Sequence, residues 1–325
     1  MEIYLAVTID TECDKGPLWR VQQPIGYRSV LEGVPQRLQP LFEGFLIKPT
    51  YLLSPEIIEH DGCVAVFKHL EGQCELGTHL HGEFIEPHRP PPQTVTMTGI
   101  MQHQYTSEME KAKLVNLTRL FESGFGRKPL SFRAGRFGIG KHSLRILDEL
   151  GYLVDSSVTP YAIHDDLNFW GSPVTPYHPS EEDPRLRGSL KILEAPVTIH
   201  SRFLSGFPEG WLVDQGPQAL WFRLARKIFG RDYVRPIWLR PSFRDFNDMK
   251  QVIDAHLKMV GSGKPALLVM MFHSVEVIAA ASPYAQNEEE AAVFLKRLEQ
   301  TLGYCQELGA KSIGLSQAAD IEWQR

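Results

Sequence analysis

Five short polar clusters, each at the end of an apolar run, carry the side chains of this chain that could do chemistry. Together they supply a carboxylate pair, two histidines two residues apart, an arginine, an aspartate and a late histidine, the groups that a metal-assisted hydrolase needs. The clusters are residues 8–12, 77–81, 133–136, 155–157 and 272–274. Because the carboxyl ends of parallel strands converge on one face of an α/β sheet or barrel, residues this far apart in sequence can share one pocket.

Asp10 and Glu12 end the first apolar run, residues 3–9. Alternate residues of a strand share a face, so both carboxylates can point into the same space. One of them could ligate a divalent metal while the other takes a proton from water. The alternative is that both cap the turn that follows, where acidic residues are common.

His79 and His81 end the apolar run that begins at Glu75, and they also share a face because side chains alternate along a strand. Such a pair at a strand end is a usual way to place two imidazoles on zinc or a similar ion. The alternative is a buried structural pair or a surface pair. His88, in the proline-rich stretch that follows, is a weaker ligand candidate.

Three further polar residues stand at the ends of apolar runs. Arg133, beside small residues, suits a buried guanidinium that pairs with a carboxylate, although a surface arginine at a turn would look the same. Asp155 could orient an imidazole through its ring N–H, or it could cap a turn. His273 ends the most apolar run of the chain and is a candidate general acid, whereas a lone histidine in such a place is usually a core or rim residue.

Three residues outside these roles are candidate substrate contacts. Arg136 belongs to the same cluster as the predicted buried arginine. Tyr105 and Trp170 could stack on the faces of a sugar, although aromatic residues of this kind are more often packing residues.

Short apolar runs alternate with helical patterns in the first half of the chain and again after residue 241, which predicts a parallel sheet, open or closed into a barrel. The expected strands are residues 3–9, 49–53, 75–80, 131–133, 153–155, 193–199, 266–272 and 312–315. The expected helices are residues 30–45, 63–70, 106–124, 141–150, 218–229, 246–260 and 287–307. Residues 160–241, rich in Pro, Gly, Trp and Tyr, break the rhythm, and we expect a loop-rich functional cover within one domain of residues 1–325.

The composition, 43% hydrophobic and 22% charged, is that of a soluble globular protein. The net charge is −5 and no long basic run is present, so nucleic acid is not an expected partner, and the short basic segment 223–227 is interpreted as a solvated face. No segment predicts a transmembrane helix, and the N-terminus lacks the pattern of a signal peptide. Four widely spaced cysteines without a CxxC pair indicate reduced thiols, so we expect a cytoplasmic location.

Taken in order, TIDTE at 8–12, GTHLH at 77–81 and RAGRFG at 133–138, with Asp155 and His273, resemble the motifs of a divergent branch of the polysaccharide deacetylase family, the NodB-homology carbohydrate esterases. The resemblance covers nearly the whole chain. It implies a distorted (β/α) barrel of about seven parallel strands, with residues 160–241 as a long insertion before the last strands. It also implies a divalent metal, commonly zinc, and hydrolysis of an N- or O-acetyl group on a sugar or glycan precursor.

The same resemblance implies roles for the catalytic residues. Asp10 matches the catalytic base, Arg133 the arginine that holds this base, and His273 the histidine that protonates the leaving amine or alkoxide. Asp155 matches the intervening motif only loosely.

For the metal, Glu12 takes the role that commoner family members give to an aspartate adjacent to the base, a position that Thr11 fills here. His79 matches the first histidine of the second motif. The usual second histidine lies further along, in the region of Phe84, so His81 takes its place in our assignment.

Two other functions fit the same residues. A metal-dependent amidohydrolase acting on a small amide also uses two histidines at a strand end, although that class needs further ligands later in the chain. A catalytically inactive carbohydrate-binding relative would keep the barrel without the chemistry, and the departures at Thr11 and Phe84 favour it.

Overall fold

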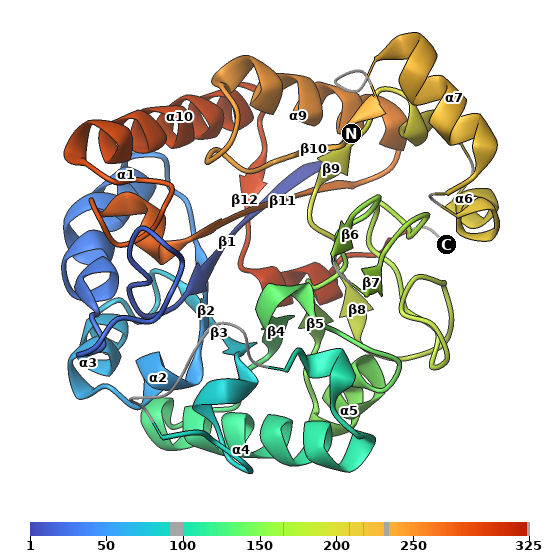
Figure 1. The fold of residues 1–325 in the computed structure, drawn as a ribbon. Coiled ribbons are helices and arrows are strands. Elements are labelled where there is room, and N and C mark those ends of the chain that lie inside the picture. Colours follow the sequence, from blue (N-terminus) through green and yellow to red (C-terminus); the bar gives the residue numbers. More distant parts are fainter. Residues whose placement is uncertain (92–99, 165, 208, 217, 231–233, 324–325) are drawn as a thin grey trace.

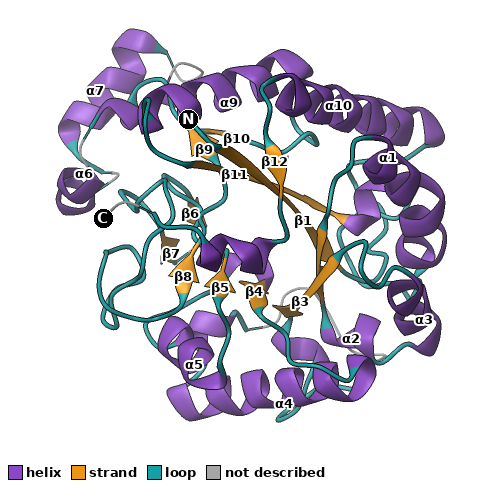
Figure 2. Ribbon diagram, turned by 180° about the vertical axis from the view of Figure 1, so that it is seen from behind, coloured by secondary structure: helices purple, strands orange, loops and turns teal. Residues whose placement is uncertain are grey.

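The structure is a computed structural model that describes residues 1–91, 100–164, 166–207, 209–216, 218–230 and 234–323. At its centre, an eight-stranded sheet curls into a distorted barrel with helices on its outer side (Figures 1 and 2). In chain order the strands are β1 (Ile3–Thr11), β2 (Thr50–Leu53), β3 (Glu75–Leu80), β4 (Ser131–Ala134), β5 (Val154–Asp155), β8 (Leu193–Glu194), β11 (Ala266–His273) and β12 (Lys311–Ser312). The predicted fold class, a distorted (β/α) barrel of about seven parallel strands, is confirmed.

Seven strands form one continuous path in the order β11-β1-β2-β3-β4-β5-β8, and β12 pairs with β1 beside this path. All of these pairs are parallel. The longest pair, β1 with β11, runs in register from Ile3 opposite Ala266 to Asp10 opposite His273. Both strands are buried almost throughout, which explains why they read as unbroken apolar runs in the sequence.

Four helices lie close to their predicted ranges: α4 (Ser107–Phe125), α5 (Ser143–Leu150), α9 (Phe246–Val260) and α10 (Glu288–Glu307). Side-chain caps define three of their starts, since Thr106, Asp245 and Asn287 each accept a hydrogen bond from a backbone N–H of the first turn. Further helices are α1 (Gln39–Gly44), α2 (Pro55–Ile58), α3 (Asp61–His69), α6 (Glu209–Gln215) and α7 (Leu220–Phe229).

The single helix predicted over residues 30–45 is in fact two pieces. A π-helical segment covers Ser29–Leu38, and α1 follows it. Pro35 lies inside the first piece and Pro40 at the start of the second. Neither proline has an N–H to donate, so a regular α-helical hydrogen-bond ladder cannot run through both positions.

The insertion at 160–241 closes the barrel between β8 and β11. It contributes two antiparallel pairs, β6 (Ile163–His164) with β7 (Leu167–Asn168) and β9 (Ile199–His200) with β10 (Ile237–Trp238). Thr198 exchanges backbone and side-chain hydrogen bonds of 3.0 and 2.8 Å with Val269 of β11, and its carbonyl accepts from Leu239. The predicted strand 193–199 is therefore split into β8 and β9, with Pro196 between them.

A 3₁₀ helix, Leu315–Asp320, covers the amino ends of the strands. Its first residues donate to the side chains of Thr50 and Glu75, which begin β2 and β3. The strand predicted over 312–315 is therefore wrong beyond Ser312, because this segment caps the barrel instead of extending the sheet. The opposite end, where the predicted chemical groups lie, stays available for a site.

All four cysteines lie among the described residues as buried free thiols, in agreement with the absence of a CxxC pair. Within the described part of the chain, no helix has the length and apolar character that crossing a membrane requires.

Candidate active site

The strand register brings the predicted groups to the carboxyl end of the barrel. Asp10 on β1 lies opposite His273 on β11. Two strands further along, His79 on β3 lies opposite Arg133 on β4. Asp155 on β5 lies opposite the residue before Arg133. Residues separated by up to 263 positions in sequence thus share one rim of the barrel.

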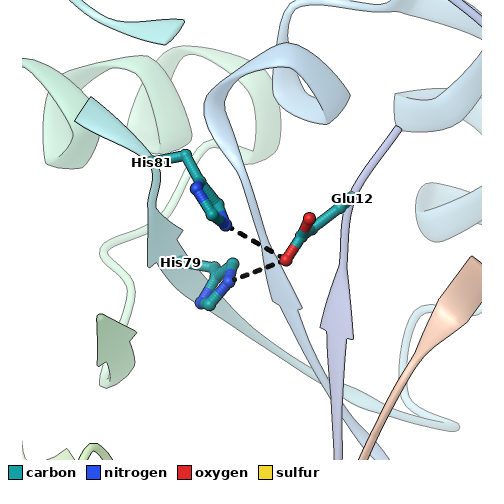
Figure 3. A group of neighbouring side chains, drawn as sticks. All are labelled: Glu12, His79 and His81. Atoms are coloured by element: carbon teal, nitrogen blue, oxygen red, sulfur yellow. Dashed lines mark hydrogen bonds and ion pairs between the residues drawn. The ribbon is translucent and has the colours of Figure 1, made fainter. Parts of the chain in front are cut away.

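Glu12, His79 and His81 form a cluster that could hold a metal ion (Figure 3). Glu12 Oε1 lies 3.2 Å from His79 Nε2 and 3.1 Å from His81 Nε2. One ligand atom from each residue lies within 4.8 Å of the others, and each residue is at most 2% exposed. Ligands 2.0–2.1 Å from a tetrahedral zinc ion lie roughly 3.3 Å from one another, so two imidazoles and one carboxylate at this spacing fit such an ion.

The hydrogen bonding of His79 is a second indication of a cation at this point. His79 Nδ1 lies 2.9 Å from the carbonyl oxygen of Arg133, which can only accept, so Nδ1 carries the proton. In the neutral ring, Nε2 then presents a lone pair to Glu12 Oε1, which is also an acceptor. Two acceptors this close need positive charge between them, as a metal ion or as a second ring proton. A backbone carbonyl on the far nitrogen is a usual support for a metal-bound histidine.

Lys15 is a site residue that the sequence reasoning missed. Its ammonium lies 3.1 Å from Glu12 Oε2, and its side chain is fully buried. It also approaches Cys13 Sγ at 3.4 Å and the ring of Phe84 at 5.4 Å from the centroid. Burial lowers the pKa of Lys15, but the neighbouring acidic groups outweigh this and raise it, so the ammonium stays charged. Only its spacing of three residues from Glu12 could have pointed to it.

Glu83 supports His81 from behind. Its Oε1 lies 3.5 Å from His81 Nδ1 and 3.3 Å from Arg136 Nη1. Burial opposes protonation of His81, yet Glu12 and Glu83 outweigh it and raise the pKa of His81 to about 9. Burial likewise favours the neutral form of Glu83, but His81 and Arg136 lower its pKa to about 2. Arg136, a predicted substrate contact, is 23% exposed and so lies at the mouth of this network.

Two glycines let other groups approach the cluster of Glu12, His79 and His81. A Cβ on Gly135 would lie 2.9 Å from the His81 ring and 2.5 Å from the carbonyl of Leu80. A Cβ on Gly82 would lie 2.3 Å from the hydroxyl of Tyr105. Tyr105, the second predicted substrate contact, is half-buried and lies against Gly82, the residue that follows His81.

Arg133 holds Asp10 in a fully buried ion pair, as its sequence context suggested. Its Nη1 donates to Asp10 Oδ1 at 2.8 Å, and Nη2 donates to the hydroxyls of Thr8 and Ser156, both at 2.9 Å. Burial raises the pKa of Asp10, but neighbouring positive charge, chiefly that of Arg133, outweighs it and lowers the pKa below its ordinary value. Asp10 is therefore ionised at neutral pH and can accept a proton.

Asp155 supports this arginine indirectly. Its oxygens accept from the Ser157 hydroxyl at 2.7 Å and the Ser157 amide at 3.1 Å, and the same hydroxyl accepts from the amide of Ala134. The imidazole contact predicted for Asp155 is not found among the described residues. Glu194 lies beside it in register on β8. Burial and the charge of Asp155 raise the pKa of Glu194 well above its ordinary value, so this pair of acids retains a proton.

Glu276 is the carboxylate that orients an imidazole. Its Oε1 accepts from His273 Nδ1 at 2.9 Å and from Arg240 Nη2 at 2.7 Å, while Oε2 accepts from the hydroxyl of Ser242. Burial raises the pKa of Glu276, but Arg240 and His273 lower it to about 2. His273 Nε2 is left facing Asp10, 3.9 Å from Oδ2, and its side chain keeps 12% exposure. The structure buries Glu276 completely.

Trp170, the third predicted substrate contact, lies apart from the cluster of Glu12, His79 and His81. It is 3% exposed, and its ring packs edge-on against Phe222 of α7 with 4.7 Å between centroids. Both residues line a cavity of about 580 Å³ in the insertion. None of the described residues that line this cavity belongs to the Glu12 cluster.

No protein-family model matches this chain, and no curated protein matches it. Among solved structures, it is similar to a protein assigned as a polysaccharide deacetylase from Mycobacterium smegmatis, with a TM-score of 0.55 and 17% identity over 98% of this chain and 89% of the other. It is also similar to branching enzymes of the GH57 type from Pyrococcus horikoshii (TM-score 0.52, 12% identity, 100% and 71% of the two chains) and Thermococcus kodakaraensis (0.53, 11%, 100% and 72%). At these identities the likeness shows the fold, and function has to be argued from the site.

We predict that the purified protein binds one divalent metal ion per chain at Glu12, His79 and His81. Glu12→Gln removes the carboxylate ligand and should lower bound zinc at least about tenfold, measured by plasma mass spectrometry after equilibration. Glu276→Gln, which changes a buried carboxylate outside the cluster, is the matched control and should keep wild-type metal content. Equal zinc in Glu12→Gln and wild type would contradict this site.

Metal binding should release a proton and weaken at low pH. The pKa of His81 is about 9 without metal, so its ring is protonated at neutral pH and has to lose that proton to become a ligand. Zinc affinity should therefore fall about tenfold for each unit of pH below 9. Calorimetry in buffers of different ionisation enthalpy measures the proton count, and a value of zero at pH 7 would show that His81 is not a ligand.

Removing the Arg133 side chain should leave Asp10 as an uncompensated buried charge. We expect Arg133→Met to lower the free energy of unfolding by about 3–5 kcal/mol, measured by urea denaturation. Adding Asp10→Asn in the same chain should recover a large part of this loss, because the unpaired charge is gone. Equal stability of the single and double variants would mean that packing, and not charge pairing, explains the effect.

Proposed function

We propose that this protein is a metal-dependent hydrolase that removes an acyl group, foremost acetyl, from a sugar or glycan precursor. One observation carries the proposal: a carboxylate with two imidazoles, an ionised aspartate held by arginine, and an imidazole held by a carboxylate occupy one rim of the barrel. A metal-assisted acyl hydrolysis needs a ligand set, a base and an acid in this combination. The fold likeness to the Mycobacterium smegmatis protein is consistent with the same reaction class.

In this proposal Glu12, His79 and His81 hold the metal, which when bound supplies a water of lowered pKa and polarises the acyl carbonyl. Asp10 accepts the proton of the attacking water. Its ionised state is maintained by Arg133, which donates to the oxygen that faces away from His273. The second oxygen of Asp10, Oδ2, lies on the side of His273, the proposed acid.

His273 donates a proton to the departing amine or alkoxide. Its Nδ1–H is held by Glu276, which fixes the ring orientation. The reactive proton therefore sits on Nε2, which faces Asp10. Edge-on contact with Trp19, 5.0 Å between ring centroids, holds the imidazole from another side. This separation of roles lets Asp10 gain a proton while His273 loses one.

The two departures from the family pattern have local explanations that favour an active site over an inactive relative. The hydroxyl of Thr11 donates to the carbonyl of Ile9, and the ligand position is met by Glu12 instead. The position four residues after His79 is Glu83, which supports His81. We propose that the ligand set has shifted at the ends of the same strands and is not lost.

Acetate release from a panel of acetylated sugars by the zinc-loaded protein tests the proposed function. Small linear and cyclic amides serve as the comparison substrates. Turnover of acetylated sugars that disappears in Glu12→Gln would support the proposal. Turnover of small amides alone would contradict the sugar substrate, and no turnover of either class by zinc-loaded protein would contradict the enzyme.

His273→Asn should lower the turnover number by about a hundred- to ten-thousand-fold, the usual contribution of a general acid. Bound zinc should be unchanged, because His273 does not belong to the cluster. Substrates with a better leaving group should lose less, since they depend less on protonation. A uniform loss across leaving groups would mean that His273 has a structural role.

A further inference from the structure

Two cavities are lined largely by residues of the insertion. The first, of about 340 Å³, has Phe137, Arg235, Pro236, Trp238, Arg240 and Arg244 in its lining. The second is the cavity of about 580 Å³ that contains Trp170, and it shares Arg235 and Pro236 with the first. The two hollows are therefore neighbours, joined at one arginine and one proline.

One wall of the first cavity contacts the proposed proton donor, His273. Arg240, one of its walls, lies 3.1 Å from His273 Nδ1 and pairs with Glu276. Phe137, another wall, packs its ring against the guanidinium of Arg133, 5.9 Å from the centroid. A group leaving from beside His273 would thus enter a space whose walls include three arginines and several aromatic residues.

The walls of the two cavities are basic, whereas the chain as a whole has a net negative charge. The whole chain carries 34 basic and 39 acidic residues, yet the described lining of the two cavities holds five arginines and no carboxylate. They are Arg223, Arg226, Arg235, Arg240 and Arg244. For Arg223, Arg226 and Arg235, no carboxylate among the described residues forms an ion pair. Guanidinium groups in a concave site suit the planar, bidentate recognition of phosphate.

We propose that the two cavities form a subsite for phosphate groups linked to the acylated sugar. This inference rests on the proposed function for the sugar end and adds the chemical class of what the sugar is attached to. The aromatic walls, Trp170, Phe222 and Trp238 among them, suit the apolar or ring-containing part of such a substrate. A phosphate could come from a soluble sugar phosphate or from a lipid-linked one.

Isothermal titration with N-acetylglucosamine 1-phosphate and with N-acetylglucosamine tests this subsite directly. We expect the phosphorylated sugar to bind at least about tenfold more tightly. Arg226→Gln with Arg235→Gln should remove most of that difference. Arg119→Gln, an exposed arginine on α4, is the matched control and should not change it. Repeating the titrations after metal removal distinguishes phosphate binding by these arginines from phosphate binding by the metal.

A second arm presents an acetylated sugar linked to a polyprenyl phosphate in vesicles of phosphatidylcholine. Arginine-dependent binding of this compound alone supports the subsite with a lipid-linked source, and binding of the soluble compound supports it with a soluble source. The subsite would be overturned if N-acetylglucosamine and its 1-phosphate bound equally well and the lipid-linked sugar did not bind. It would also be overturned if Arg119→Gln lost as much affinity as the double arginine variant. Acetate release is measured separately, so acetate from neutral sugars without a phosphate preference defeats this inference but not the proposed function.

A second observation concerns the outer face of α7, which lies at the periphery of the molecule (Figure 1). Leu220, Leu224 and Ile228, spaced four residues apart on one side of the helix, are 69%, 49% and 72% exposed. The opposite side is buried through Phe222 and Ala225. An exposed apolar stripe of this kind needs a partner surface.

The charge of α7 indicates what that partner is. Its sequence, LWFRLARKIF, contains three basic residues and no acidic one. Apolar side chains flanked by arginine and lysine are the pattern of a helix that lies in the interface of an anionic bilayer. We infer that α7 docks the protein on an anionic membrane surface. The helix would lie in the plane of the membrane and not cross it.

Co-sedimentation with vesicles of mixed phosphatidylglycerol and phosphatidylcholine, and of phosphatidylcholine alone, tests this docking. We expect binding to the mixed vesicles that decreases with salt and is at least about tenfold weaker in Leu224→Glu with Ile228→Glu. Val293→Glu, at a similarly exposed apolar position on α10, is the control. Unchanged binding in the double variant, or an equal loss in the control, would overturn the inference. So would self-association without vesicles that the double variant abolishes, since the occupant would then be a second copy.

Discussion

The buried guanidinium of Arg133 is the group on which the rest of the candidate site depends. It is fully buried, and it joins β1, β4 and the segment after β5 through hydrogen bonds to Asp10, Thr8 and Ser156. Its backbone carbonyl also accepts the Nδ1 proton of His79, which leaves Nε2 turned to Glu12. One residue therefore sets both the charge of the proposed base and the tautomer of a proposed metal ligand. A buried charge without its partner would be strongly destabilising, so this pairing also constrains how the strands pack.

Charge alternates across the rim in a way that burial alone would not favour. One series runs Arg133, Asp10, His273, Glu276 and Arg240, and the other runs Lys15, Glu12, His81, Glu83 and Arg136. Most of these groups are almost without solvent contact, where an unpaired charge costs several kcal/mol. Apolar residues would fill this volume at no such cost. The network is therefore better explained by chemistry at the rim than by stability.

The insertion at 160–241 completes the barrel and supports the candidate site. By supplying β8 and the segment from Val197 to Leu239, it bridges the gap to β11 and brings Arg240 against Glu276. The same segment carries the arginine-lined cavities and α7, so closure of the barrel, support of the proposed acid and the proposed contacts to phosphate and membrane all come from one stretch of chain. The proposed substrate would thus lie with its sugar at the rim and its linked group along the insertion.

The sequence by itself determined the elements and most of the chemical inventory. Apolar runs buried on both faces, such as 266–272, predict parallel strands because no polar alternation is required there, and the polar residue ending each run predicts a site. Asp10, Glu12, His79, His81, Arg133 and His273 could all be named in this way. The resemblance in their order also predicted the barrel, which the strand path confirms.

Only the tertiary structure decided which groups meet. Glu276 takes the orienting role that the sequence suggested for Asp155, because register places Asp155 behind Arg133 and a turn places Glu276 under His273. Lys15, Glu83 and Arg240 could not be recognised, since they stand in loops or short turns where no periodicity marks a side chain as facing the site. Periodic patterns report which face of an element is buried, whereas contacts between elements depend on register, strand order and loop path, and these arise only when the whole chain packs.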